Sequence, residues 1–121
     1  MSFRDSTPSP AAMNFLTEIL SPGRTVCHAP GASKKRLFET IAHVISDDQP
    51  SLVYEEVLSL LNARERLGST GLGQGIAIPH CRVEACPRPI GSLITLAQAI
   101  DFDAPDEQPV DLLFVLLVPG E

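Results

Sequence analysis

His80 is the side chain of this sequence with the clearest chemical potential. It follows the apolar stretch Ile76–Ile78 and Pro79, within the run NARERLGSTGLGQGIAIPHCR that spans Asn62–Arg82. Pro79 fixes its own φ and restricts the preceding residue, Ile78, to an extended conformation. We therefore expect an imidazole held rigidly at the end of a short strand, where one ring nitrogen can act as a nucleophile.

Groups that can donate hydrogen bonds to a phosphate precede this histidine. Glycines let the backbone take positive φ and approach other groups closely, so consecutive amides can face an anion. Hydroxyls and a guanidinium add further donors, and phosphoryl transfer depends mainly on such positioning and charge. The candidates are Arg64, Ser69, Thr70, Gly71, Gly73 and Gly75.

The residue types alone leave purely structural interpretations open. His80 could be a strand-end histidine whose ring nitrogens are satisfied by the backbone. Arg64 could be a solvated arginine that complements the dipole at a helix C-terminus. Ser69 and Thr70 belong to a Ser-Thr-Gly turn, which also serves simply to leave a helix.

Two other polar residues are expected to be structural. Glu65 could orient a neighbouring group, but a surface ion pair with Lys34 or Arg66 is the favoured interpretation. His43 has apolar neighbours on a predicted helix and is expected to be a structural or surface residue.

We expect no metal and no cofactor. The spacing GLGQG followed by Ile76 departs from the dinucleotide-binding pattern G-x-G-x-x-G, and no strand stands just before it. Zinc ligands could come from Cys27-His28, His80-Cys81 and Cys86, but there is no C-x-x-C spacing and these residues lie on elements that need not meet.

Composition predicts one globular domain. The chain has 121 residues, of which 44% are hydrophobic and 20% charged, with a net charge of −6. This charge argues against nucleic-acid and anionic-lipid partners. The longest apolar run, Leu112–Val118, is too short to span a bilayer, and no secretory signal is visible, so we expect a cytoplasmic protein whose three cysteines are reduced thiols.

The elements that must position His80 are helices followed by strands. Residues 1–12 are expected to be a disordered tail and residues 13–121 the domain. The predicted helices come mostly before the predicted strands, and this order predicts an α/β fold in which helices pack on a mixed sheet. The expected helices are Asn14–Leu20, one capped by Ser33 and running to Ser46, and one capped by Ser51 and running to Arg66; the expected strands are Thr25–His28, Ile76–Ile78, Ser92–Ala99 and a central Val110–Val118, with a surface loop or ragged edge at Asp101–Pro109.

The run RERLGSTGLGQGIAIPH, together with Gly91–Val118, resembles the fructose/mannitol-type enzyme IIA proteins of the bacterial phosphotransferase system, and their nitrogen-regulatory branch in particular. The resemblance extends from about Leu20 to the C-terminus, and its most specific part is the STG-to-PH segment. It implies a mixed sheet flanked by helices. It also implies that His80 accepts a phosphoryl group and that Arg64, sixteen residues earlier, is an active-site arginine.

The same resemblance implies a function and its partners. His80, through Nε2, would receive its phosphoryl group from an HPr-like carrier that enzyme I charges with phosphoenolpyruvate. In the nitrogen-regulatory branch the phosphorylation state is read by target proteins, such as potassium-transport or sensor-kinase components. The alternatives are a sugar-specific enzyme IIA that passes the group to enzyme IIB, and a non-catalytic interaction module of the same fold.

Two features depart from the family pattern. Members of the family continue into further helices and a second histidine beyond Glu121, where this sequence ends, so we expect either a C-terminally truncated chain or a protein that ends early. One face of the sheet would then need cover from a partner subunit, such as a second copy. Cys81 stands where glycine is common, and it would either crowd a docking surface or add an oxidisable thiol beside His80.

Overall fold

The computed structural model describes residues 17–30 and 33–120. The expected tail, residues 1–12, lies outside the described residues, as does the first part of the expected helix Asn14–Leu20. Residues 17–19 are helical.

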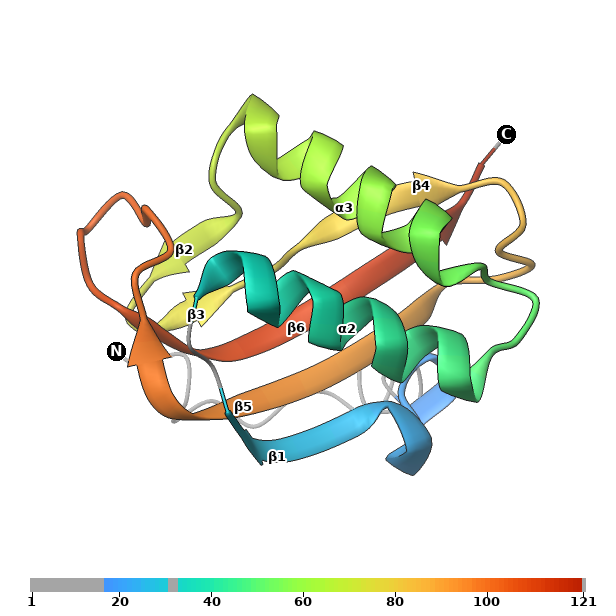
Figure 1. Cartoon of the computed structure of the whole chain (residues 1–121), viewed down its shortest axis with the longest axis horizontal. Coiled ribbons are helices and arrows are strands. Elements are labelled where there is room, and N and C mark those ends of the chain that lie inside the picture. The colour runs from blue at the N-terminus through green and yellow to red at the C-terminus, as the bar shows by residue number, and fades with distance from the viewer. Residues whose placement is uncertain (1–16, 31–32, 121) are drawn as a thin grey trace.

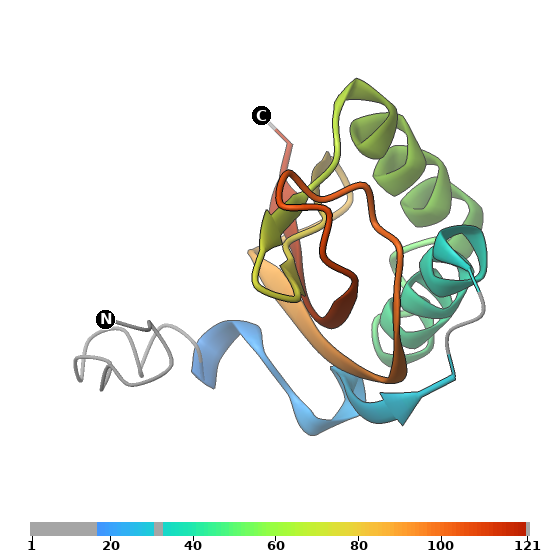
Figure 2. The same ribbon diagram turned by 90° about the vertical axis from the view of Figure 1, so that its left-hand side faces the viewer.

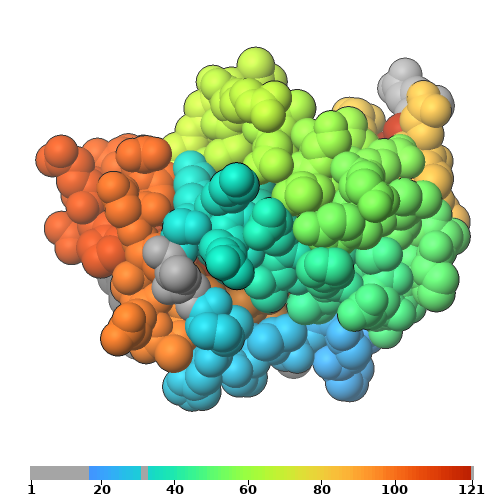
Figure 3. Space-filling view, viewed as in Figure 1, coloured from blue at the N-terminus to red at the C-terminus, as the bar shows by residue number. Residues whose placement is uncertain are grey.

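A mixed six-stranded sheet carries two helices on one face (Figure 1). The view turned by 90° shows both helices on the same side of the sheet (Figure 2), and their side chains cover it in the space-filling view (Figure 3). This is the α/β arrangement that the sequence predicts. The helices are α2 (Lys34–Asp48) and α3 (Tyr54–Leu67), and a short 3₁₀ helix, η2, spans Pro22–Arg24. The strands are β1 (Thr25–Ala29), β2 (Gly71–Gly73), β3 (Ile76–Ala77), β4 (His80–Val83), β5 (Ile90–Ile100) and β6 (Val110–Pro119).

Strand β6 is central, as its nearly continuous apolar sequence predicts. It pairs antiparallel with β5 and parallel with both β3 and β4. The sheet order is β1-β5-β6-β3-β2, with β4 also on β6. Alternate residues of β6 point to opposite faces: Leu113, Val115 and Leu117 are fully buried in the core, whereas Leu112 and Phe114 are half-buried on the other face.

The two helix caps predicted from sequence have different outcomes. Ser33 caps α2 as predicted, since its Oγ accepts a hydrogen bond from the Arg36 N–H at 3.1 Å. The prediction that Ser51 caps α3 is wrong. The Leu52 N–H instead donates to the Gln49 carbonyl at 2.9 Å and the Leu52 side chain is fully buried, so a turn comes first and α3 begins only at Tyr54.

The apolar faces of the helices agree with the periodicity. In α2, Leu37, Ile41 and Ile45 are fully buried, and Val44 is half-buried. In α3, Val57 and Leu61 are buried, but Val53, which precedes the helix, is 52% exposed. Each helix therefore packs its apolar side on the face of the sheet that carries Leu113, Val115 and Leu117 of β6.

The strand around the histidine differs from the prediction. Strand β3 ends at Ala77, and His80 begins a new strand, β4, rather than ending the first. The reason is the pair Ile78-Pro79: Ile78 turns its N–H to the Thr70 carbonyl at 3.0 Å, and Pro79 has no N–H to donate. Strands β3 and β4 are thus two parallel partners of β6 separated by a two-residue interruption.

The segment between β5 and β6 is an irregular loop, as predicted, but it is anchored in the core. Phe102 is fully buried and Ala104 is 5% exposed. The Phe102 ring lies 6.0 Å from the Phe38 ring, and Lys34 Nζ lies 4.3 Å from the Phe102 ring centroid. This loop therefore bridges the sheet and the start of α2. Within the described ranges, no helix combines the length and the apolar character needed to cross a membrane.

Candidate functional site

His80 is exposed, and one of its two ring nitrogens is held by the backbone. Nδ1 lies 2.8 Å from the Ile78 carbonyl oxygen. A carbonyl oxygen only accepts hydrogen bonds, so in the neutral ring Nδ1 carries the proton. Nε2 then keeps its lone pair. The geometry leaves Nε2 as the ring nitrogen that is available as a nucleophile, and its role as the phosphoryl acceptor stays a prediction.

The backbone that holds the ring is fixed from both sides. The Ile78 N–H donates to the Thr70 carbonyl at 3.0 Å, and the Leu116 N–H donates to the Pro79 carbonyl at 2.9 Å. His80 is itself in register with Leu116 of the central strand. The imidazole is therefore presented from rigid structure, which the Ile-Pro-His sequence predicts.

The hydroxyls of Ser69 and Thr70 are engaged inside the protein. Ser69 Oγ donates to the Phe102 carbonyl at 2.6 Å and accepts from the Gly71 N–H at 3.1 Å. Thr70 is 5% exposed, and its hydroxyl donates to Glu65 Oε1 at 2.7 Å. These contacts use the donors that were predicted to face a phosphate, and they make the Ser-Thr-Gly turn a structural support for the histidine segment.

Glu65 pairs with Lys34, one of the two partners predicted, but the pair does not lie on an open surface. Lys34 Nζ is 2.6 Å from Glu65 Oε2, and the glutamate side chain is only 9% exposed. Thr70 adds its backbone N–H to the same oxygen at 3.1 Å. Glu65 therefore ties α2, α3 and the Ser-Thr-Gly turn together.

Arg64 lies in the last turn of α3 and is half-exposed. Its Nη1 donates to the Gly68 carbonyl at 2.9 Å, just beyond the helix. A cation at this place complements the helix dipole. The guanidinium has five N–H groups, so the contact with Gly68 still leaves donors for a ligand.

Gly71 and Gly73, two of the glycines predicted to face a phosphate, lie in strand β2, and Gly75 lies in the turn that follows it. A side chain at Gly71 would place Cβ 2.8 Å from Ala104 Cβ, so only glycine lets the loop after β5 approach this closely. Gly73 has φ of 98°, and the following residue, Gln74, donates its N–H to Asp106 at 2.8 Å. That hydrogen bond and a second one from the Gln108 N–H lower the pKa of Asp106.

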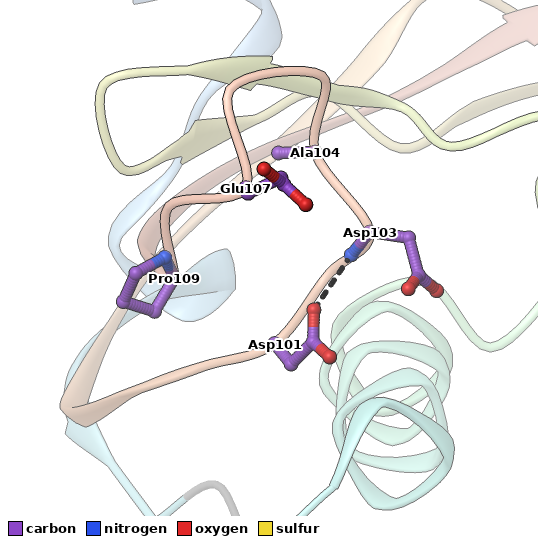
Figure 4. Close-up of a pocket in the computed structure, with 5 residues that line it drawn as sticks. All are labelled: Asp101, Asp103, Ala104, Glu107 and Pro109. Carbon is purple, nitrogen blue, oxygen red and sulfur yellow. Dashed lines mark hydrogen bonds between the residues drawn. The ribbon is translucent and has the colours of Figure 1, made fainter.

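The loop between β5 and β6 also forms an acidic hollow, lined by Asp101, Asp103, Ala104, Glu107 and Pro109 (Figure 4). The Asp103 N–H donates to the Asp101 carboxylate at 3.0 Å, a local turn contact. No group of three or more His, Cys, Asp or Glu side chains in residues 17–30 and 33–120 is arranged to hold a metal ion.

Cys81, the residue that follows His80, is partly buried. Its side chain packs against the hydrophobic core. Burial raises its pKa to about 12, and the neighbouring Cys86 adds to the shift. His43, predicted to be structural or at the surface, is exposed and stacks on Tyr54 at 4.0 Å between ring centroids.

Over residues 18–121 the sequence matches the family model described as phosphoenolpyruvate-dependent sugar phosphotransferase system, EIIA 2. The chain belongs to this family. The match confirms the resemblance that the STG-to-PH segment indicates. It covers the helices, the sheet and the histidine segment of this chain.

Known relatives of this EIIA 2 protein share both sequence and fold. A nitrogen regulatory protein of Pseudomonas aeruginosa is 52% identical over 104 residues, which cover 86% of this chain and 68% of the relative. The crystal structure of nitrogen regulatory protein IIA-Ntr from Neisseria meningitidis has a TM-score of 0.83 at 44% identity, covering 88% of this chain and 73% of that one. The mannitol IIA protein of Escherichia coli, with a TM-score of 0.69 and 19% identity over 84% of this chain and 73% of its own, supports the fold alone.

The sheet face opposite the helices carries a further feature near His80. An apolar groove runs over the sheet face opposite the helices and reaches the residue that anchors His80. It is lined by Leu72, Gly73, Gln74, Ile76, Ile78, Leu93, Leu112 and Phe114. The sequence predicts that one sheet face needs cover from a partner subunit, but the residues that line this groove were not predictable. Strand β6 is apolar at nearly every position, so its sequence does not separate the residues of its two faces.

Proposed function

We propose that this protein is a cytoplasmic phosphohistidine carrier of a phosphoenolpyruvate-dependent phosphotransferase system. His80 Nε2 accepts a phosphoryl group from the phosphohistidine of a small HPr-like protein. The observation that carries this proposal is the 2.8 Å contact between Nδ1 and the Ile78 carbonyl, which leaves an exposed Nε2 with its lone pair on a rigid backbone. Membership of the EIIA 2 family supports the reaction class.

The transfer moves one phosphoryl group between two imidazoles. The Nε2 lone pair of His80 forms a bond to phosphorus while the phosphorus–nitrogen bond of the donor breaks, and that electron pair returns to the donor ring. Charge builds on the three equatorial oxygens in a loose transition state. Arg64, at the end of α3, is the cation that we propose for these oxygens, because one of its five N–H groups serves Gly68 and the others stay available.

We further propose a regulatory role, nitrogen- or potassium-related, in place of sugar transport. Its support is the name of the Pseudomonas aeruginosa relative, a nitrogen regulatory protein at 52% identity. Phosphorylation would add about −1.5 to −2 charges to an exposed site. A change of this size is enough to recruit or repel a target, such as a component of potassium transport or a sensor kinase.

The test is intact-mass spectrometry after incubation with phosphoenolpyruvate, enzyme I and its HPr-like carrier. Wild type should gain one acid-labile phosphoryl group, and His80→Ala should gain none. His43→Ala is the matched control, because it removes an exposed histidine from α2 and should be phosphorylated as wild type is. No gain in wild type, with the carrier shown to be phosphorylated, would overturn the proposal in favour of a non-catalytic docking module.

A further inference from the structure

The structure assigns a positioning role to Glu65: through Thr70 it holds the backbone that keeps the His80 imidazole in its Nδ1–H form. The inference deepens the proposed function, on which it rests, by naming what prepares Nε2 for attack. Glu65 does not contact the ring. It acts through a continuous series of hydrogen bonds that begins on the helices and ends at Nδ1.

The first part of the series is the Glu65 carboxylate, whose two oxygens both accept hydrogen bonds from the protein. Oε1 accepts from the Thr70 hydroxyl at 2.7 Å, and Oε2 accepts from the Thr70 N–H at 3.1 Å and from Lys34 Nζ at 2.6 Å. Lys34 is itself held by the Phe102 carbonyl at 3.3 Å and by the face of the Phe102 ring. Glu65 is only 9% exposed, so these three donors replace most of its water. A carboxylate bound in this way has little freedom to move.

The second part runs from Thr70 to the ring. The Thr70 carbonyl accepts the Ile78 N–H at 3.0 Å, and the Ile78 carbonyl accepts Nδ1–H at 2.8 Å. Ile78 lies in the interruption between β3 and β4, where no register pair with β6 holds it. The hydrogen bond to Thr70 therefore holds Ile78 where pairing with a neighbouring strand does not. Glu65 clamps Thr70 by both its N–H and its hydroxyl.

The chemical consequence follows from the tautomer. If Thr70 shifts, the Ile78 carbonyl turns away from Nδ1 and the neutral ring loses the contact that favours Nδ1–H. The Nε2–H form then gains population, and in this form Nε2 has no lone pair to attack phosphorus. Loss of the clamp should therefore reduce phosphoryl transfer while leaving His80 present and exposed.

The decisive measurement is the tautomer of His80, followed by long-range ¹H–¹⁵N NMR at a pH where the ring is neutral. Wild type should be predominantly Nδ1–H. Glu65→Ala and Thr70→Val should shift the ring toward a mixture of tautomers and slow transfer from the HPr-like carrier about tenfold, since small misplacements of a reacting group cost up to about a hundredfold. Thr70→Ser, which restores the hydroxyl, should recover both signals.

Glu55→Ala is the matched control, because it removes an exposed carboxylate from the first turn of the same helix. It should change neither the tautomer nor the rate. A folded Glu65→Ala protein with the wild-type tautomer would overturn the inference, and Thr70→Val decides the question if Glu65→Ala does not fold. If the variants shift the tautomer while the wild-type protein accepts no phosphoryl group, that pair of results would support the positioning role of Glu65 and refute the proposed function.

Discussion

At the scale of single residues, the site depends on which atoms already have partners. The Ile78 carbonyl accepts a hydrogen bond from Nδ1 of His80, so Nε2 is the ring nitrogen that keeps its lone pair. The Thr70 hydroxyl donates to Glu65 and the Ser69 hydroxyl donates to the Phe102 carbonyl, so both support the turn that precedes the histidine segment. Arg64 keeps N–H donors available beyond its contact with the Gly68 carbonyl.

The position of the phosphoryl group on the ring is a direct prediction from this arrangement. Phosphorylated His80 should carry the group on Nε2, because Nδ1 keeps its proton in the bond to Ile78. Two-dimensional ¹H–¹⁵N and ³¹P NMR of the phosphorylated protein distinguish the two isomers. Phosphorus coupled to Nδ1 would contradict the assigned tautomer.

Thiol reactivity gives a second prediction for single residues. Because burial raises the pKa of Cys81 to about 12, very little of this thiol is ionised at pH 8, and the thiolate is the reactive form. Burial also raises the pKa of Cys86, whereas Cys27 is exposed. Iodoacetamide at pH 8 should therefore modify Cys27 in the folded protein, and Cys81 and Cys86 only after unfolding. Peptide mass spectrometry measures this order, and early labelling of Cys81 would show that its segment opens.

At the scale of elements, regular periodicity made α2, α3, β5 and β6 predictable from sequence. Strands β2 and β4 were not predictable, because each is short and is a strand only through its partner. Gly71–Gly73 has no apolar alternation and pairs with β3, whereas His80–Val83 pairs with β6, which comes later in the sequence.

The candidate site was predictable to a similar extent. The Ile-Pro-His sequence indicated a rigid histidine, because proline acts on its immediate neighbours. The contact of Glu65 with Thr70 was not predictable, because it depends on how the chain reverses after α3. The same limit explains Ser51, whose turn is set by the burial of Leu52.

The helix caps provide the prediction for this scale. Ser33→Ala should lower the free energy of unfolding by about 1 kcal/mol, the usual value of a capping hydroxyl, because it removes the bond to the Arg36 N–H. Ser51→Ala is the matched control: it is exposed and precedes α3 by a turn, so its effect should stay within about 0.5 kcal/mol. Urea unfolding measures both. Equal losses would mean that Ser51 supports α3 in a way that this structure does not show.

At the scale of the whole molecule, a buried arginine joins three parts of the chain. Arg24 is 4% exposed and donates from Nη2 to the Ile19 carbonyl at 2.8 Å and from Nε to the Gly91 carbonyl at 3.0 Å. Its Nη1 pairs with Asp48 at the end of α2. The start of the described chain, the sheet and the helical layer therefore meet at Arg24, and within residues 17–30 and 33–120 Asp48 is the one carboxylate paired with it.

This ion pair predicts how stability changes with pH. Hydrogen bonds from Gln49 and Arg24 lower the pKa of Asp48, so the folded protein keeps the carboxylate ionised to lower pH than the unfolded chain does. Its contribution is complete above the pKa of a free aspartate, about 3.9, and disappears as pH falls through the lowered value in the folded state. Asp48→Asn should therefore be less stable than wild type at pH 7, and this difference should shrink below about pH 4.

The size of the loss at pH 7 is expected to be about 2 kcal/mol, below the 3–5 kcal/mol typical of fully buried pairs, because water reaches part of Asp48. Urea unfolding of both proteins from pH 7 down to the acid limit of folding measures the difference. Asp47→Asn, at an exposed neighbouring position, is the control and should follow wild type. If Asp48→Asn is less stable than wild type by the same amount at every pH, the effect comes from packing or capping of α2. Only a charge that is lost on protonation can bring the stability of wild type down to that of the variant at low pH.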